Sequence, residues 1–528
     1  MRYLLSQGVT LTAERTPQQE AARFNSTSLT YAELERRSNN LAHTLLELGL
    51  KRGERVGIYM NKSLESAVAM YGIMKAGGAY VPLDPFAPVG RVGFVISDCG
   101  IRHLVTNQTK VDAVRQILRE ISCLQHLIGI ASQAEMQVNC LEWEQVYQAP
   151  HQYPGLNLTE QDLAYILYTS GSTGTPKGIM HTHRSGLSFA EWAAAEYELT
   201  SEDRLSNHAP LHFDLSTFDF FSGAIAGATT VIVPEALTKF PANMARFIEE
   251  ERISVWYSVP FALIQLMQRG GLEKRDLSAL RWILFAGEVF PTKHLRQLID
   301  MLPSVRFSNL YGPTETNVCT YYHVERLPEV SDETIPIGKP CANIEDLVVD
   351  ADNHPVAPGE VGELLIRGGV VMKGYWGQPE KTANGFYRRP AFDQFEDLFY
   401  RTGDLVQLDA DGNYRYLGRK DRQIKTRGYR VELDEVEIAL LAHPNIEEAA
   451  AYPVPDGQGS NLIESAVILK IGAHLTDEEL IAHISNRLPP YAIPVRIDFL
   501  IDFPRTSTGK INRRELQETA VARQAGVA

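Results

Sequence analysis

Residues 168–178 combine three glycines, several hydroxyl side chains and one lysine, directly after an apolar run at 163–168. Glycine lets successive backbone N–H groups curl around an anion, hydroxyl groups donate further hydrogen bonds, and Lys177 supplies a positive charge. The alternative, an exposed linker, fits poorly because the segment is short and abruptly flanked by apolar residues. Lys177 is followed by Gly178 rather than by Ser or Thr, so this is not a Walker A loop. The segment therefore predicts a phosphate-binding loop outside the common nucleotide-binding patterns.

The elements that position this loop are predicted from apolar periodicity and turn residues. Thr30 and Glu33 form a capping box before an apolar helical face, and Gly49 ends that helix. Apolar runs at 229–234 and 282–286 are typical of buried strands that alternate with helices. This alternation predicts an α/β fold for most of the chain.

A change of pattern near residues 418–421 predicts a domain boundary. Before it, an Asp-Gly turn at 409–413 joins two strand-like segments. After it, a strand-like segment precedes a helical pattern at about 433–443 and then further strands, which is typical of an α+β unit of domain size. We expect a large N-terminal domain at 1–418 and a small C-terminal domain at 419–528.

Composition restricts the classes of function. The chain has 528 residues and a formal net charge of −14, which argues against general binding of nucleic acid or of anionic membranes. The basic stretch at 419–430 lacks interleaved aromatic residues apart from Tyr429. The five cysteines are scattered without a CxxC pair, which fits reduced thiols better than a disulfide framework. With no secretory signal and no apolar segment of membrane-spanning length, we expect a soluble cytoplasmic protein that binds neither nucleic acid nor membrane.

An ordered series of motifs gives these local features a common interpretation. Among them are AsnLeuTyrGlyProThrGlu at 309–315, TyrArgThrGlyAspLeu at 400–405 and ThrGlyLysIleAsn at 508–512. The full series lies at 29–34, 74–84, 168–178, 213–216, 309–315, 362–368, 400–405, 418–433, 488–494 and 508–512. With these motifs the chain resembles the adenylate-forming superfamily, which contains nonribosomal peptide synthetase adenylation domains, acyl- and aryl-CoA ligases and luciferases. The resemblance covers nearly the whole chain.

The resemblance implies a fold and a reaction in two steps. The large domain would contain two α/β subdomains and a β-barrel-like subdomain, and the small, mobile α+β domain would swing about a hinge at Asp421. In the first half-reaction a carboxylate attacks the α-phosphate of MgATP and releases pyrophosphate. In the second, a pantetheine thiol displaces AMP to form a thioester, and Gly428 would let the pantetheine pass close to the backbone. ATP and Mg²⁺ are therefore the expected cofactors.

Joining two anions requires charge neutralisation and in-line positioning. By resemblance, Lys510 is the main cation and contacts both the substrate carboxylate and the phosphoryl oxygens. Glu315 would bind Mg²⁺, which prefers oxygen ligands, and Thr314 would contact a phosphate oxygen. The other implied nucleotide contacts are Thr169, Ser170, Gly171, Ser172, Thr173, Gly174, Lys177, Ala286, Gly287, Glu288, Asn309, Tyr311, Asp404 and Arg419. Of these, Tyr311 would stack on adenine, and Asp404 would accept the ribose hydroxyls. For each residue the alternative is an ordinary surface, turn or core role, and the co-occurrence of the motifs favours function.

Asp214 indicates that the substrate is an amino acid rather than a simple carboxylic acid, because a substrate α-ammonium group in a buried site needs a carboxylate partner. The family's pocket positions correspond to Asp214, Leu215, Phe218, Tyr257, Leu284, Ala286, Leu310, Val318, Cys319 and Lys510. Apart from Asp214 and Lys510 this lining is uncharged, which disfavours charged substrate side chains, and Phe218 and Tyr257 should shorten the pocket. A small apolar amino acid remains, and the set resembles that of free-standing L-prolyl-[peptidyl-carrier protein] ligases of the anatoxin and pyrrole type. Pipecolate, valine or a proline analogue would be poor substrates rather than non-substrates, because one methylene is worth only ~1–3 kcal/mol of discrimination.

The acceptor of the second step is expected to be a separate phosphopantetheinylated carrier protein. No carrier-protein serine motif and no condensation motif follows residues 508–512, although the sequence could also be a piece of a larger synthetase. One alternative is an acyl- or aryl-CoA ligase that uses free CoA, against which Asp214 argues. The other is a non-catalytic nucleotide-binding regulatory or scaffold protein, against which Lys510, Glu315 and Lys177 argue.

Overall fold

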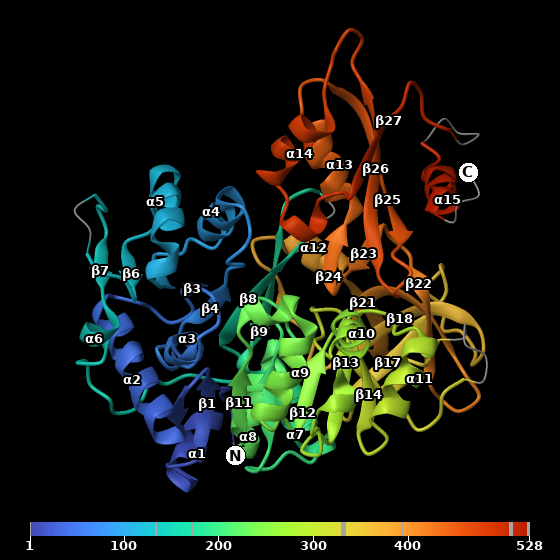
Figure 1. Ribbon diagram of the computed structural model, residues 1–528. Helices are drawn as coiled ribbons and strands as arrows, with labels where there is room; N and C mark the ends of the chain where they lie inside the picture. Colours follow the sequence, from blue (N-terminus) through green and yellow to red (C-terminus); the bar gives the residue numbers. More distant parts are fainter. Residues whose placement is uncertain are drawn as a thin grey trace.

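The computed structural model describes residues 2–132, 135–171, 173–328, 334–392, 394–505 and 511–524. In Figure 1 the C-terminal part of the chain, coloured orange to red, lies over one side of a larger body made by the rest. Within the described residues no helix is both long and apolar enough to cross a membrane.

Two mainly parallel sheets form the large body. The first is ordered β19-β9-β8-β4-β3-β5-β6-β7. Its strands are β3 (Arg55–Tyr59), β4 (Ala79–Pro82), β5 (His103–Thr106), β6 (His126–Ile128), β7 (Asn139–Leu141), β8 (Leu163–Thr169), β9 (Lys177–Thr182) and β19 (Gly374–Tyr375). Strands β3 to β8 run parallel, whereas β9 pairs antiparallel with β8, so the predicted phosphate loop joins two neighbouring strands.

The second sheet is ordered β16-β15-β14-β13-β12-β10-β11-β1-β2. Its strands are β1 (Glu20–Phe24), β2 (Thr27–Thr30), β10 (Arg204–Asn207), β11 (Thr229–Ile232), β12 (Val255–Ser258), β13 (Trp282–Ala286), β14 (Arg306–Tyr311), β15 (Thr320–His323) and β16 (Lys339–Pro340). The strands from β1 to β14 in this order are parallel, and their buried apolar runs are typical of a sheet covered on both faces.

Helices fill the space between and around these sheets. The helices of the large body are α1 (Gln7–Arg15), α2 (Tyr31–Glu47), α3 (Leu64–Lys75), α4 (Val89–Asp98), α5 (Val111–Glu120), α6 (Trp143–Val146), α7 (His183–Glu196), α8 (Gly223–Ala226), α9 (Pro241–Glu250), α10 (Pro260–Arg269), α11 (Thr292–Met301) and α12 (Pro379–Asn384). Buried side chains of α2, α3, α7 and α8 join those of both sheets in one hydrophobic cluster. On the outer faces, α4 and α5 cover the first sheet and α9 to α11 cover the second.

The segment expected to be barrel-like is a five-stranded antiparallel sheet. Strands β17 (Ile344–Val349), β18 (Val361–Gly368), β21 (Phe395–Leu408) and β20 (Phe386–Phe392) follow one another, and β22 (Tyr414–Arg419) pairs with β21. The predicted Asp-Gly turn joins β21 to β22. After β22 the chain leaves this sheet, close to the boundary predicted at 418/419, which remains a prediction.

The small C-terminal domain begins with the hairpin β23 (Gln423–Thr426) and β24 (Tyr429–Glu432). It continues with α13 (Leu433–Leu441), β25 (Ile446–Pro455), β26 (Asn461–Leu469), α14 (Asp477–Ser485), β27 (Arg496–Phe499) and α15 (Arg513–Gln524). Alternating residues of β25 face opposite sides: Ala449 and Ala451 pack toward α13 and α14, whereas Ala450 and Val454 pack toward α15.

The structure confirms the expected mixed α/β fold with a large N-terminal and a small C-terminal domain. The capping box at Thr30 and Glu33 is formed, and helix α2 follows it directly. The two predicted buried strands are β11 and β13, and the helix expected at about 433–443 is α13.

Candidate active site

The main candidate site is a cavity between the carboxyl ends of β12, β13 and β14, the loop after β8 and the hairpin β23–β24. Carboxyl ends of parallel strands are the usual place for ligands in open α/β sheets. The predicted residues that line this cavity are Thr169, Ser170, Asp214, Leu215, Tyr257, Ala286, Gly287, Tyr311, Thr314, Val318, Asp404, Arg419 and Gly428. Residues assigned to the nucleotide, to the acid and to the thiol therefore line one continuous cavity.

Other predicted residues do not line the cavity. These are Gly171, Thr173, Gly174, Lys177, Phe218, Leu284, Glu288, Asn309, Leu310, Glu315, Cys319 and Asp421. Asn309 uses its amide inside the protein, donating a 2.8 Å hydrogen bond to the carbonyl oxygen of Pro336. Ser172 and Lys510 lie outside the described residues. The nearest described neighbours of Lys510, Arg505 and Ile511, form a β-bridge with each other in the small domain.

The predicted phosphate loop makes a tight turn between β8 and β9. A Cβ atom on Gly171 would lie 2.1 Å from the carbonyl oxygen of Thr175, so only glycine fits there. The hydroxyl oxygen of Thr169, at the cavity end of β8, is buried and has no hydrogen-bond partner among the described residues. An unpaired buried hydroxyl is costly, and a ligand oxygen in the cavity would satisfy it. Burial lowers the pKa of Lys177 to about 8, and the nearby Arg430 adds to this effect.

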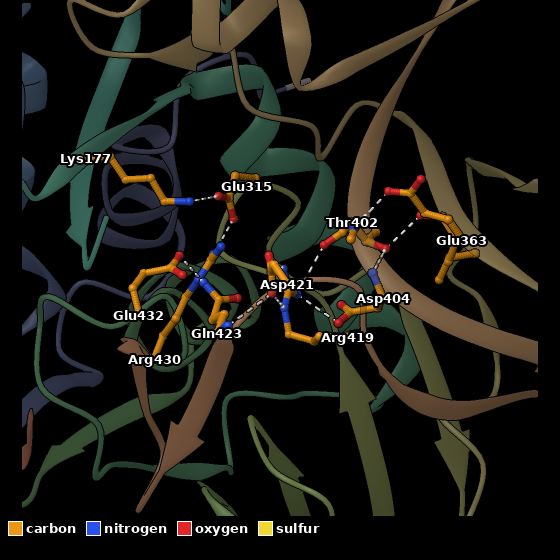
Figure 2. A network of polar contacts seen from close by, with 12 residues as sticks. Lys177, Glu315, Glu363, Thr402, Asp404, Arg419, Asp421, Gln423, Arg430 and Glu432 are labelled. Carbon is orange, nitrogen blue, oxygen red and sulfur yellow. Dashed lines mark hydrogen bonds and ion pairs between the residues drawn. The ribbon is translucent and has the colours of Figure 1, made fainter. Parts of the chain in front are cut away.

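Glu315 is completely buried. Figure 2 shows it beside Lys177 and Arg430 at the edge of the site. Its carboxylate lies 3.2 Å from Nζ of Lys177 and 2.7 Å from Nη1 of Arg430, and it accepts a 2.9 Å hydrogen bond from the hydroxyl of Tyr375. Burial alone would raise the pKa of Glu315, but Arg430 and Lys177 outweigh it and hold the pKa well below its usual value. Glu315 is therefore ionised. It forms one ion pair with Lys177 on β9 of the large domain and another with Arg430 in the hairpin of the small domain.

Asp404, on β21, is held between two side chains that also line the cavity. Nη1 of Arg419 donates a 2.8 Å hydrogen bond to its Oδ1, and the Tyr311 hydroxyl donates to its Oδ2. Arg419 also makes two 2.7 Å hydrogen bonds to Asp421, so the predicted hinge residue orients the guanidinium that contacts Asp404 (Figure 2). The arrangement presents an oriented carboxylate to the cavity, which is the group needed to accept two hydroxyls of a sugar.

Asp214 lies in the loop before a π-helical turn at Phe218–Ser222. Burial raises the pKa of its carboxyl, whereas hydrogen bonds from Thr314 and from the backbone of Leu215, together with the nearby Lys425, act in the opposite direction. The loop is fixed from behind: the Thr217 hydroxyl donates to the Asp214 carbonyl oxygen at 2.6 Å and accepts from Nδ2 of Asn317 at 2.9 Å. A partly desolvated carboxylate of this kind gains most from a substrate that brings its own positive charge.

The wall around Asp214 is apolar. Leu215, Tyr257, Ala286 and Val318 line the cavity beside it. Phe218 packs edge-to-face against Tyr257, with ring centroids 5.5 Å apart, and so supports that side chain from behind. Leu284 and Leu310 belong to the same hydrophobic cluster, and Cys319 packs in a separate one.

The hairpin β23–β24 brings the small domain into the site. Gly428 lines the cavity in a left-handed conformation (φ +85°), and a Cβ atom there would lie 2.6 Å from Cγ1 of Val259. Ser170, beside the phosphate loop, donates a 2.8 Å hydrogen bond to the carbonyl oxygen of Arg430. The hairpin therefore touches both the phosphate loop and the strand ends of the large domain.

Two basic residues of this hairpin were not singled out from the sequence. Arg430 pairs with Glu315, and the half-buried Lys425 lines the cavity close to Asp404 and Asp214. The basic composition of 419–430 was the available signal. Which of its cations enter the site depends on domain packing, and the sequence pattern does not contain that information.

Comparisons with known proteins agree with this geometry. The family described as AMP-binding enzyme matches residues 9–376, and the AMP-binding enzyme C-terminal domain matches residues 435–510. An L-proline--[L-prolyl-carrier protein] ligase of Pseudomonas fluorescens is 36% identical over 503 residues, which are 94% of this chain and 96% of that protein. A protein of the same name from Streptomyces coelicolor is 37% identical, covering 97% and 96% of the two chains.

A solved structure has the same fold. The Vibrio cholerae adenylation domain AlmE, in complex with glycyl-adenosine-5'-phosphate, matches with a TM-score of 0.86 over 99% of this chain and 98% of that one, at 22% identity. The resemblance of the sequence to the adenylate-forming superfamily is thus confirmed by family, by relatives and by fold. The chain belongs to the AMP-binding enzyme family.

Proposed function

We propose that this enzyme is an AMP-forming ligase that activates a small apolar amino acid, above all L-proline, and transfers it to the phosphopantetheine thiol of a carrier protein. The observation that carries the proposal is the half-buried Asp214 carboxylate, set in an apolar wall of the same cavity that Asp404, Tyr311 and Thr169 line. Both similar ligases are named for L-proline and its carrier protein, which supports the same substrate and acceptor here.

Each part of the cavity has a task in this reaction. We assign the ribose hydroxyls of ATP to Asp404, which Arg419 and Tyr311 orient, and the phosphates to the loop between β8 and β9. The acid would lie with its α-ammonium on Asp214, and proline fits because its protonated ring nitrogen still has two N–H donors. Lys510 remains our proposed main cation for the two joining anions.

The residues at the phosphate end fit a magnesium ion. Mg²⁺ is usually held by one or two carboxylates together with substrate phosphates, and Glu315 is a buried carboxylate whose low pKa keeps it ionised. When bound, the ion would neutralise phosphate charge. In the described arrangement Arg430 and Lys177 neutralise Glu315 instead.

The test is to identify the product directly. Purified protein would be incubated with ATP and one acid at a time, in the presence of either a phosphopantetheinylated carrier protein or free CoA, and the thioesters measured by intact mass spectrometry. We expect prolyl-carrier to form fastest, with pipecolate and valine slower and with little prolyl-CoA.

Two results would overturn the proposal in different ways. Efficient formation of an aryl- or fatty acyl-CoA, with no amino acid transferred, would identify a CoA ligase. Binding of ATP without any thioester or AMP, with every acid and thiol, would identify a nucleotide-binding regulatory protein.

A further inference from the structure

The turn between β25 and β26 reaches across to the large domain next to the cavity. Its residues 456–460 close on themselves, because Oδ1 of Asp456 accepts hydrogen bonds from the backbone N–H groups of Gln458 (2.7 Å) and Ser460 (3.0 Å). The turn is therefore a preformed loop, and it meets the segment of the large domain between β13 and α11.

Glu288, in that segment, is the centre of the contact. Its Oε1 accepts a 2.6 Å hydrogen bond from the Ser460 hydroxyl and a 2.8 Å hydrogen bond from the backbone N–H of Gly428. The Ser460 oxygen also accepts a 2.6 Å hydrogen bond from the N–H of Arg427. One carboxylate of the large domain thus holds two separate loops of the small domain, and both donors belong to segments that adjoin the site.

The close approach depends on two glycines. A Cβ atom on Gly459 would lie 2.2 Å from Cγ of Pro291, and one on Gly428 would lie 2.6 Å from Cγ1 of Val259. Such distances are far inside van der Waals contact, so neither position accepts a side chain in this orientation of the domains. Gly459 is exposed and does not line the cavity. Its close approach to Pro291 therefore concerns the packing of the two domains against each other and not the shape of the cavity.

Fixing the N–H of Gly428 fixes the backbone that borders the cavity at the place assigned to the thiol. Burial raises the pKa of the Glu288 carboxyl, and the hydrogen bonds from Ser460 and Gly428 act in the opposite direction. A hydrogen bond to a carboxylate is stronger than one to a neutral acceptor, so losing it leaves a partly buried group short of a partner. The contact exists only while the hairpin and the β25–β26 turn lie against the large domain together.

We infer that the β25–β26 turn positions the small domain for the thioester-forming step. Glu288 holds this turn through the hydrogen bond that it accepts from Ser460. Building on the proposed function, the turn holds the small domain in the orientation in which Gly428 borders the cavity. Ser460 is a positioning residue that acts through Glu288 and Gly428 and touches no substrate. The first step, formation of the acyl-adenylate, does not need this contact.

The variant Ser460→Ala tests the inference. Each half-reaction would be measured separately: amino-acid-dependent ATP–pyrophosphate exchange for the first, and carrier loading from preformed prolyl-adenylate for the second. We expect unchanged exchange and loading slowed about 10- to 100-fold, the range for a lost hydrogen bond to a charged group. Ser485→Ala, at the end of α14 and outside this contact, is the matched control and should change neither rate.

Two further variants separate positioning from folding. Gly459→Ala, whose Cβ would collide with Pro291, should slow loading at least as much as Ser460→Ala. Because φ of Gly459 is +93°, alanine also strains the turn itself, so the control is Gly457→Ala, which has φ +73° but nothing within 4 Å of its Cβ and should leave loading close to the wild type. In a double-mutant cycle, Glu288→Gln and Ser460→Ala should be non-additive in loading, because they remove the same contact.

Domain orientation gives a readout independent of activity. A donor dye on one domain and an acceptor dye on the other would report domain orientation by resonance energy transfer. In Ser460→Ala, fewer molecules should show the transfer efficiency that corresponds to the domain arrangement described above. Equal loss of both half-reactions, or full loading activity in Ser460→Ala and Gly459→Ala, would overturn the inference. A wild-type protein without any exchange would instead refute the proposed function.

Discussion

At the scale of single residues, the proposed function depends on which charged side chains are buried and on which groups they contact. Asp214 has a raised pKa because it is buried, whereas Glu315 has a lowered pKa because two cations outweigh its burial. The two carboxyls are therefore prepared for different tasks. No described residue of the large domain forms an ion pair with Asp214, which can accept one from a ligand, whereas Glu315 is already neutralised.

Asp214→Asn should weaken amino-acid binding selectively. Removing one member of a buried, hydrogen-bonded charge pair costs about 2–5 kcal/mol, so we expect the Kd for L-proline to rise by roughly 10²-fold. The affinity for ATP should stay unchanged, because Asp404 and the phosphate loop are untouched. Isothermal titration calorimetry with each ligand checks this, and unaltered proline affinity would refute the assignment of the pocket.

Glu315→Gln should change how stability depends on pH. The pKa of Glu315 in the folded protein lies below its ordinary value of 4.5, so its ionised form contributes stability that is fully present above about that pH. This contribution is lost as the pH falls from there through the lowered pKa. In thermal melts between about pH 6 and pH 3, the wild type should therefore lose stability more steeply than Glu315→Gln. Parallel curves would show that Glu315 is not held ionised.

Lys510→Ala should lower adenylation by roughly 10²–10³-fold, the scale for removing one preorganised stabilising donor. Thioester formation from supplied prolyl-adenylate should be spared, because that step no longer joins two anions. Single-turnover assays of the two steps would decide, and equal losses in both would remove Lys510 from its proposed role.

At the scale of elements, local sequence signals were sufficient wherever one segment determines its own structure. The capping box at Thr30, the buried strands β11 and β13 and the Asp-Gly turn after β21 were predicted from neighbours in the chain and are present. The loop after β8 was predicted from its glycines, its hydroxyl residues and Lys177, and the contact that a Cβ on Gly171 would make explains why glycine is needed there.

What the sequence could not supply were contacts between distant elements. Arg430 and Glu315 are 115 positions apart, and their ion pair forms only because the hairpin β23–β24 enters the large domain. Glu288 was assigned to the nucleotide by resemblance, an assignment that remains a prediction, while its carboxylate here accepts from Gly428 and Ser460. Long-range packing, not local propensity, determines such partners.

The hairpin itself gives an element-scale prediction. Gly428→Ala introduces a side chain where φ is +85° and where Val259 is already in contact, so carrier loading should slow about tenfold, as expected from ~1–2 kcal/mol of strain. Adding Val259→Ala should restore part of the rate by removing the collision. No recovery in the double variant, measured by loading from prolyl-adenylate, would mean that steric fit at this point is unimportant.

At the scale of the whole molecule, two domains share one cavity. The large domain supplies the strand ends, Asp214 and the phosphate loop, and the small domain supplies the hairpin with Lys425, Gly428 and Arg430. Ion pairs and hydrogen bonds between charged groups cross this boundary, for example between Arg91 and Glu435. Such polar contacts suit the domain movement that we propose, because inter-domain interfaces with many polar groups favour relative motion of the domains.

The central claim is that this enzyme uses ATP to activate an amino acid recognised by Asp214. The most direct measurement is ATP–pyrophosphate exchange by the wild type and by Asp214→Ala, with L-proline, pipecolate, valine, benzoate and a fatty acid offered separately. We expect strong exchange with L-proline, weaker exchange with its homologues, and loss of all amino-acid-dependent exchange in Asp214→Ala. Exchange driven only by benzoate or the fatty acid, or proline-dependent exchange that survives Asp214→Ala, would contradict the claim.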